Sequence, residues 1–324
     1  MKSWRTSSIP KGTFWLTLAA LTLLAACLSL GLGSVALRDA PEAAQKIMLY
    51  IRLPRTCAAL LAGSALAVAG AVIQTVLHNP LASSGVLGVN SGAGLAVAVV
   101  CAIAPMAQRY TPVIAFFGAL LAVMMVVALA QCTGASRMTV VLAGVAISNI
   151  FSAGIDAVVT FVPEALGGVS DYRIGGFSGV TMARIAPAAV MIGVSLAAVL
   201  TLSRQMDVLA LGSETAQSLG LSVGPVRFIL LVLAAALSGA AVSFAGLLGF
   251  VGLIVPHAMR RFVGEESGPL VAASALGGAC FVTFCDLLAR VLFAPFELPV
   301  GVVLAVTGGP FFLWLLFRRR GGRA

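Results

Sequence analysis

Charged residues are scarce in this sequence. Asp, Glu, Lys and Arg make up 10% of its 324 residues, against about 25% in typical soluble domains. Hydrophobic residues make up 60%, where about 45–50% is usual. This balance excludes a soluble globular domain. Apolar spans of ~20 residues would fill most of the chain, so the sequence predicts an all-α polytopic membrane protein with a single transmembrane domain, residues 1–324.

The sequence also lacks the patterns of an enzyme or a metal protein. It contains no GxxxxGK[ST], HExxH or GxSxG motif, so it shows no means of hydrolysing a nucleotide by itself. We expect no catalytic residue, no metal site and no cofactor bound by this chain. The cysteines have no CxxC or metal-ligand spacing and are interpreted as small apolar fillers; they are Cys27, Cys57, Cys101, Cys132, Cys280 and Cys285.

The formal net charge of +9 could indicate a nucleic-acid partner. The basic residues lie at the ends of apolar runs, however, and this pattern is typical of a protein in contact with membrane lipid. A basic start and an apolar stretch ending at Cys27 fit either a secretory signal with a lipid-modified cysteine or an uncleaved first span. We favour the span, because apolar residues continue past Cys27 and many spans follow.

About ten spans are expected, near 14–34, 55–77, 89–104, 112–131, 138–162, 184–202, 225–248, 250–262, 269–292 and 299–317. The third and the eighth are too short to cross a bilayer as straight helices, and such segments indicate a transport pathway. An even number places both termini on one side. The predicted cytoplasmic regions are then residues 1–13, the loop 205–224 and the basic tail 318–324.

The distribution of basic residues supports this orientation through the positive-inside rule. The inner regions hold Lys2, Arg5, Lys11, Arg137, Arg204, Arg227, Arg260, Arg261, Arg318, Arg319, Arg320 and Arg323, and the outer regions hold Arg38, Lys46, Arg52, Arg55, Arg109, Arg173, Arg184 and Arg290. Arg52 and Arg55 oppose the bias, so we expect them to have a function; interfacial snorkelling is the alternative.

An ungapped internal repeat aligns residues 62–80 with 238–256 at an offset of 176. In the expected topology the two copies run in opposite directions, which is the inverted-repeat arrangement of transporters. The residues Gly63, Ala65, Ala69, Gly70, Leu77 and Pro80 match Gly239, Ala241, Ala245, Gly246, Leu253 and Pro256, and further on Gly88, Ser91 and Gly92 match Gly264, Ser267 and Gly268.

A polar loop at 211–221 separates two spans on the inner side. Leu211, Thr215, Ser218 and Leu219 share one face of a short helix that Gly220 ends. Such a helix can lie on the membrane or dock into a groove of another protein. It lacks the basic residues of a membrane-surface helix, so we favour docking.

Three acids are expected within the membrane, namely Asp156, Asp286 and Glu297. An acid costs ~2.5–3.5 kcal/mol or more at the membrane centre, so each needs a partner or a wet cavity. Asp286 and Arg290 are four residues apart and can pair on one helix face. His257, after Pro256, is interpreted as a local hydrogen-bond partner rather than a ligand.

Five ordered motifs resemble those of the permease subunits of iron-siderophore, haem and cobalamin ABC importers. They are Arg-Leu-Pro-Arg at 52–55, Asn-Pro-Leu-Ala at 79–82, Leu-Gly at 211–212 through Leu-Gly at 219–220, Phe250 through His257, and Glu-Leu-Pro at 297–299 with the run to Phe312. The resemblance extends from about residue 45 to 317. It does not distinguish among siderophore, haem and cobalamin.

The resemblance implies a homodimeric permease with ten helices per subunit in the bacterial inner membrane. Two cytoplasmic ATPases that hold ATP and Mg would drive it, and an extracytoplasmic binding protein would supply the solute. Arg52, Arg55 and Arg290 match arginines that receive acids of the binding protein, so we expect a positive patch on the extracytoplasmic rim. The residues that match the ATPase-coupling helices are Leu211, Gly212, Glu214, Ala216, Leu219 and Gly220.

The resemblance also places a cytoplasmic gate at Asn79, beside Pro80. Ser136 and Arg137 lie where a second gate is expected, although Arg137 is bulkier than the small polar residues expected there. The remaining motif residues are Pro256, His257, Glu297 and Pro299. Asp156 has no place in the family pattern.

The implied mechanism is alternating access, in which ATP binding moves the coupling helices and these move the helices around a central dimer cavity. The competing hypothesis is a secondary transporter that couples to ions through Asp156 or Asp286. It accounts for the intramembrane acids and the repeat, but it leaves the polar loop and the outer arginines unexplained.

Overall fold

The computed structural model describes residues 11–33, 44–104, 110–132, 137–292 and 294–320. Every expected span is a helix, and the described residues contain no strand. These helices are α1 (Lys11–Gly31), α3 (Leu53–Leu77), α4 (Val89–Ile103), α5 (Thr111–Cys132), α6 (Arg137–Phe161), α8 (Met182–Thr201), α11 (Val223–Ala245), α12 (Val251–Val263), α13 (Ser267–Val291) and α14 (Val300–Arg320). The predicted all-α fold is confirmed.

Short elements connect the long helices. The described connections hold α2 (Ala44–Ile47), the π-helix η2 (Met48–Arg52), the 3-10 helices η3 (Ser84–Leu87) and η5 (Pro163–Ala165), α7 (Leu166–Ile174), α9 (Ser203–Ala210) and α10 (Ser213–Ser218). Seven segments of the described chain are long and apolar enough to cross a membrane. Helices α4 and α12 have only 15 and 13 residues. This confirms the prediction that the third and eighth expected spans are short.

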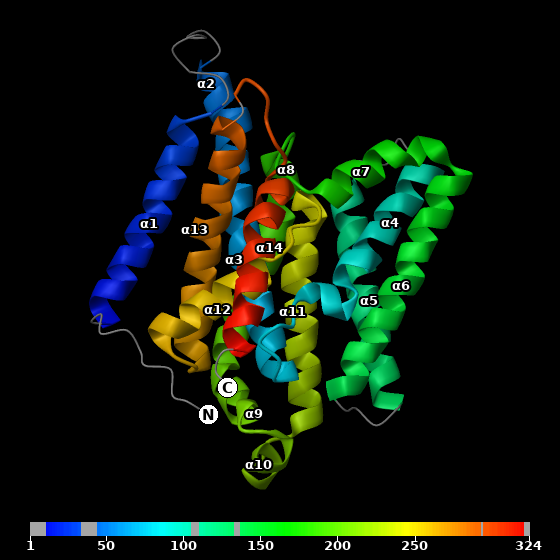
Figure 1. The fold of residues 1–324 in the computed structure, drawn as a ribbon. Helices are drawn as coiled ribbons and strands as arrows, with labels where there is room; N and C mark the ends of the chain where they lie inside the picture. The colour runs from blue at the N-terminus through cyan, green and yellow to red at the C-terminus, as the bar shows by residue number, and fades with distance from the viewer. Residues whose placement is uncertain (1–10, 34–43, 105–109, 133–136, 293, 321–324) are drawn as a thin grey trace.

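Helix α3 forms the centre of the bundle and is buried along most of its length. It packs against α11, α12 and α13 (Figure 1). Small residues permit this contact, because they let helix backbones approach closely. A Cβ added to Gly70 would lie 2.0 Å from the carbonyl oxygen of Gly252 on α12. Any side chain at Gly70 would therefore separate these two helices.

The part of the second repeat copy that lies in α11 runs opposite to the first copy, since α3 descends in Figure 1 where α11 ascends. Their local structures differ. The first copy lies in one helix up to Leu77, whereas the second is interrupted between Ala245 and Val251. The matched residues Gly88 and Gly264 both have positive φ, 76° and 83°, but their ψ angles differ, 4° and −158°. A positive φ favours glycine at both sites.

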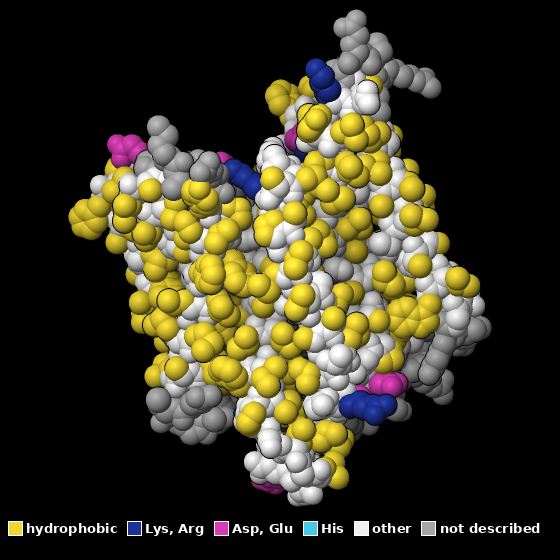
Figure 2. Space-filling model, turned by 180° about the vertical axis from the view of Figure 1, so that it is seen from behind, with side chains coloured by type: hydrophobic (Ala, Val, Ile, Leu, Met, Phe, Trp, Pro, Cys, Tyr) yellow, Lys and Arg dark blue, Asp and Glu magenta, His cyan; other side chains and the backbone are white. Residues whose placement is uncertain are grey.

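The surface is banded. Figure 2 shows hydrophobic side chains over the middle of the molecule and charged side chains toward its two ends. The exposed apolar residues include Phe117 and Leu121 on α5 and Leu142 and Ile150 on α6. The side chains in the middle of this face therefore suit contact with lipid or with another membrane subunit.

Candidate functional site

A cluster of buried charges joins α3 to α13 at the upper end of the bundle in Figure 1. Asp286 is fully buried and accepts two hydrogen bonds from Nε of Arg55, at 3.0 and 3.1 Å. Arg290 approaches the same carboxylate at 3.2 Å, which confirms the predicted pairing one helical turn apart. Asp286 is thus held between two guanidinium groups, which offset the cost of burying its charge.

The neighbouring arginines bind groups within the chain. Arg55 also pairs with Glu297, at 2.5 Å. Nη1 of Arg52 donates to the carbonyl oxygens of Leu30 and Gly31 near the end of α1, at 2.9 and 2.7 Å. These oxygens belong to the last turn of a helix, where carbonyls lack partners within the helix and attract cations.

The structure brings Arg52, Arg55 and Arg290 together, as the resemblance implies, but buries them. Their exposed fractions are 3%, 6% and 2%. These side chains are therefore buried in the structure, because the carboxylates and the α1 carbonyls bind the guanidinium groups inside the chain. Their role in docking a partner stays a prediction.

The predicted coupling loop holds two short helices, α9 and α10. Ala216 is fully buried, while Leu211 and Leu219 are exposed by 61% and 62%. The side chains of Leu211 and Leu219 thus point away from the bundle, whereas the side chain of Ala216 is packed inside it. Gly212 and Gly220 have φ of 109° and 82°, a conformation that glycine adopts without strain. Glu214 lies exposed in the first turn of α10.

The predicted break after α3 is present. His78 ends the helix in the left-handed conformation, at φ 49°. The side-chain oxygen of Asn79 accepts a hydrogen bond from the backbone N–H of Leu81 at 3.0 Å, which forms a turn around Pro80. Of the second expected gate, Ser136 lies outside the described residues. Arg137 is the first residue of α6, and its side chain is not described.

The remaining motif residues lie along α12 and the start of α14. Pro256 is buried inside α12, and the His257 ring lies 6.2 Å from the ring of Phe311 on α14. Pro299 immediately precedes α14. His257 thus lies where α12 meets α14, and Pro299 lies just before α14 begins. Glu297 belongs to the charged cluster.

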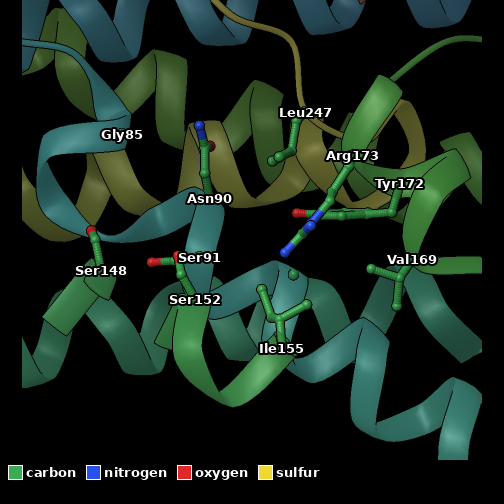
Figure 3. Close-up of a pocket in the computed structure, with 11 residues that line it drawn as sticks. Gly85, Asn90, Ser91, Ser148, Ser152, Ile155, Val169, Tyr172, Arg173 and Leu247 are labelled. Carbon is green, nitrogen blue, oxygen red and sulfur yellow. The ribbon is translucent and has the colours of Figure 1, made fainter. Parts of the chain in front are cut away.

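A pocket of about 240 Å³ opens between α4, α6 and α7, with Leu247 beside it (Figure 3). Its polar lining residues are Asn90, Ser91, Ser148, Ser152, Tyr172 and Arg173. Arg173 pairs with Asp156 at 3.0 Å, so Asp156 has the partner that its position requires. We did not predict this pocket. Ser148, Ser152 and Asp156 are spaced by four residues in an apolar span, and this polar stripe could have revealed the α6 side of it.

The sequence matches the FecCD transport family over residues 13–318. This match includes the charged cluster, the coupling loop and the pocket. The chain belongs to the FecCD transport family. The resemblance read from its motifs is therefore confirmed, and so is its interpretation as a transport protein rather than an enzyme.

The chain is similar to named permease proteins over most of its length. The chain is 37% identical to the hemin transport system permease protein HmuU of Yersinia pestis, over 87% of this chain and 86% of that protein. It is also 37% identical to the Fe(3+) dicitrate transport system permease protein FecD of Escherichia coli, over 85% and 86%. A solved structure described as an inward-facing metal-chelate type ABC transporter superposes with a TM-score of 0.84 at 26% identity, covering 95% of this chain and 99% of that one.

Proposed function

We propose that this FecCD-family protein is the transmembrane permease of an ATP-driven importer for an iron chelate, haem or a cobalamin-like solute. The family match over residues 13–318 carries this proposal. Named relatives of similar length transport hemin and ferric dicitrate, and another is a cobalamin import permease of Halobacterium salinarum.

The protein works in the bacterial inner membrane as a homodimer with both termini in the cytoplasm. Supporting this orientation, the start of α1 and the end of α14 point toward the end of the molecule that carries α9 and α10 (Figure 1). That end also holds more of the basic residues, as the positive-inside rule requires. The hydrophobic side chains over the middle of the surface in Figure 2 provide an apolar face that a second copy of the chain can contact.

Two cytoplasmic ATPases, which hold ATP and Mg, dock at the loop 205–224. The support is the exposure of Leu211 and Leu219 on a helical loop outside the apolar band. An apolar face on a short helix fits a groove in a partner. An extracytoplasmic binding protein delivers the solute at the opposite end, near the cluster of Arg52, Arg55 and Arg290. Closure of the ATPases then drives alternating access.

The alternative, an ion-coupled secondary transporter, has weaker support. The Asp286 carboxylate is already paired with both Arg55 and Arg290. Asp156 pairs with Arg173. Neither acid is a free proton or sodium site in this arrangement.

The proposed function is tested by deletion and copurification. Deleting the gene should abolish uptake of one of three labelled solutes, namely ferric citrate, haem or cobalamin, and plasmid expression should restore it. The tagged chain should copurify with an ABC ATPase. Normal uptake of all three solutes in the deletion strain would overturn the proposal.

A further inference from the structure

The hydroxyl group of Tyr172 is the unusual feature of the pocket. Tyr172 is 8% exposed, and its hydroxyl oxygen is buried without a hydrogen-bond partner among the described residues. Figure 3 shows this oxygen pointing into the pocket. Burial of an unpaired hydroxyl costs free energy that a ligand can recover by bonding to it.

The surrounding backbone fixes the direction of this side chain. The carbonyl oxygen of Tyr172 accepts a hydrogen bond from the N–H of Leu247 at 2.9 Å, so α7 is tied to the break between α11 and α12. The ring also packs beside α4, where a Cβ on Gly94 would lie at an ordinary van der Waals distance of 3.4 Å from it. The hydroxyl is therefore held in position before any ligand arrives.

The other polar groups of the pocket are rich in hydrogen-bond donors. Ser148 and Ser152 lie one turn apart on α6, and the Ser148 hydroxyl oxygen is also buried without a partner among the described residues. Asn90 and Ser91 line the side formed by α4. Arg173 reaches across the pocket in Figure 3; its Nη2 donates to Asp156, and the other N–H groups of its guanidinium are further donors. These groups suit a ligand that carries several acceptor oxygens.

We propose that this pocket binds a carboxylate arm of the transported chelate, which favours a carboxylate-bearing solute such as ferric citrate over a neutral hydroxamate. A carboxylate offers only acceptors when ionised, which matches the donors of Tyr172, Ser148 and Arg173. The volume of about 240 Å³ is below the ~300–1,000 Å³ of sites that enclose a drug-sized ligand. The pocket therefore holds part of the solute rather than all of it.

This inference rests on the proposed function, and equilibrium dialysis of the purified permease–ATPase complex tests it. The probe is radiolabelled ferric citrate, with a neutral ferric trihydroxamate as the comparison. The wild type should bind ferric citrate saturably and more tightly than the hydroxamate. Tyr172→Phe, which removes only the hydroxyl, should weaken citrate binding about tenfold, as expected for a hydrogen bond to a charged group.

Matched variants separate ligand binding from folding. Tyr50→Phe is the control, because Tyr50 is 74% exposed on η2 and lies outside the pocket; its affinity should equal that of the wild type. Ser148→Ala should weaken binding as Tyr172→Phe does. Thermal unfolding of each variant identifies any that is misfolded.

Three results would overturn the inference: no saturable binding of ferric citrate, equal affinity for the hydroxamate, or unchanged affinity in both pocket variants. Uptake in the deletion strain distinguishes these from failure of the proposed function. If uptake of any chelate requires the protein while the pocket variants bind citrate normally, the permease assignment stands and the pocket assignment fails.

Discussion

Gly63 and Gly278 face each other where α3 crosses α13. A Cβ built on Gly63 would lie 2.1 Å from the carbonyl oxygen of Gly278, and one built on Gly278 would lie 2.2 Å from that of Gly63. The two backbones are therefore in direct contact. Arg55 and Asp286 lie on the same pair of helices, so this crossing sets the distance between the buried charges.

Substitution of Gly278 by Val should force the two helices apart. Overpacking of a close contact costs about 1–3 kcal/mol, so the melting temperature of the purified protein in detergent should fall. Gly193→Ala on α8 is the control, because a Cβ there meets nothing within 4 Å; it should be neutral or stabilising. Equal melting temperatures for both variants would contradict the close crossing.

Replacement of Asp286 by Asn should destabilise the protein strongly. The substitution removes the negative charge that neutralises the buried guanidinium groups of Arg55 and Arg290. Breaking a buried ion pair typically costs about 3–5 kcal/mol of folding stability. The measurement is thermal unfolding, with the exposed Glu214→Gln as the control. A small loss, comparable to that of the control, would show that the cluster is hydrated rather than buried.

The hypothesis that the outer arginines dock a binding protein needs a variant that preserves the fold. The double variant Arg52→Glu with Arg55→Glu does not, because Arg55 is buried; it should lower both the stability of the protein and its affinity for the binding protein. Glu297→Gln removes one internal competitor for Arg55, so it should leave docking unchanged or strengthen it. We would measure docking affinity at two salt concentrations, since salt screens exposed charges. Weaker docking in Glu297→Gln would argue against recognition by Arg55.

Changes in the coupling loop should uncouple ATP hydrolysis from uptake. Leu219→Asp places a charge on the exposed apolar face, and Gly220→Val strains a residue whose φ is 82°. Both variants should reach the membrane but support little solute uptake with their ATPases. Gln217→Asn, on the same helix, should behave as the wild type. Full uptake in both loop variants would exclude docking at this loop.

The isolated chain should not hydrolyse ATP, because its sequence contains no phosphate-binding loop. A coupled-enzyme assay on the purified permease should give only the background rate, and addition of its ATPases should produce turnover. Robust hydrolysis that survives further purification would remove the basis of the permease proposal.

The sequence predicted the helices well because each is a long apolar run with clear ends. The span expected at 112–131 is Thr111–Cys132 in the structure. The span expected at 225–248 ends earlier, at Ala245, because Gly246 turns the chain with φ of 66°. Hydropathy alone could not locate this end, since apolar residues continue beyond it.

Contacts between distant residues were harder to predict. The pair of Asp286 and Arg290 follows from helical spacing, but the partner of Arg55 is 231 residues away. The pocket likewise gathers side chains from α4, α6 and α7, and α7 itself was not expected. Its composition is less apolar than that of the spans, so it gave no hydropathy signal.

The junction of α7, α14 and the interrupted repeat is held by main-chain atoms. Gly176 donates to the carbonyl oxygen of Ala245 at 2.8 Å, and Gly301 donates to that of Gly175 at 3.3 Å. Backbone bonds of this kind do not depend on side-chain identity, apart from the glycines that the turns require. Evolution can therefore exchange the side chains that line the neighbouring pocket without rebuilding the frame, and one scaffold can diverge to accept chemically different cargoes.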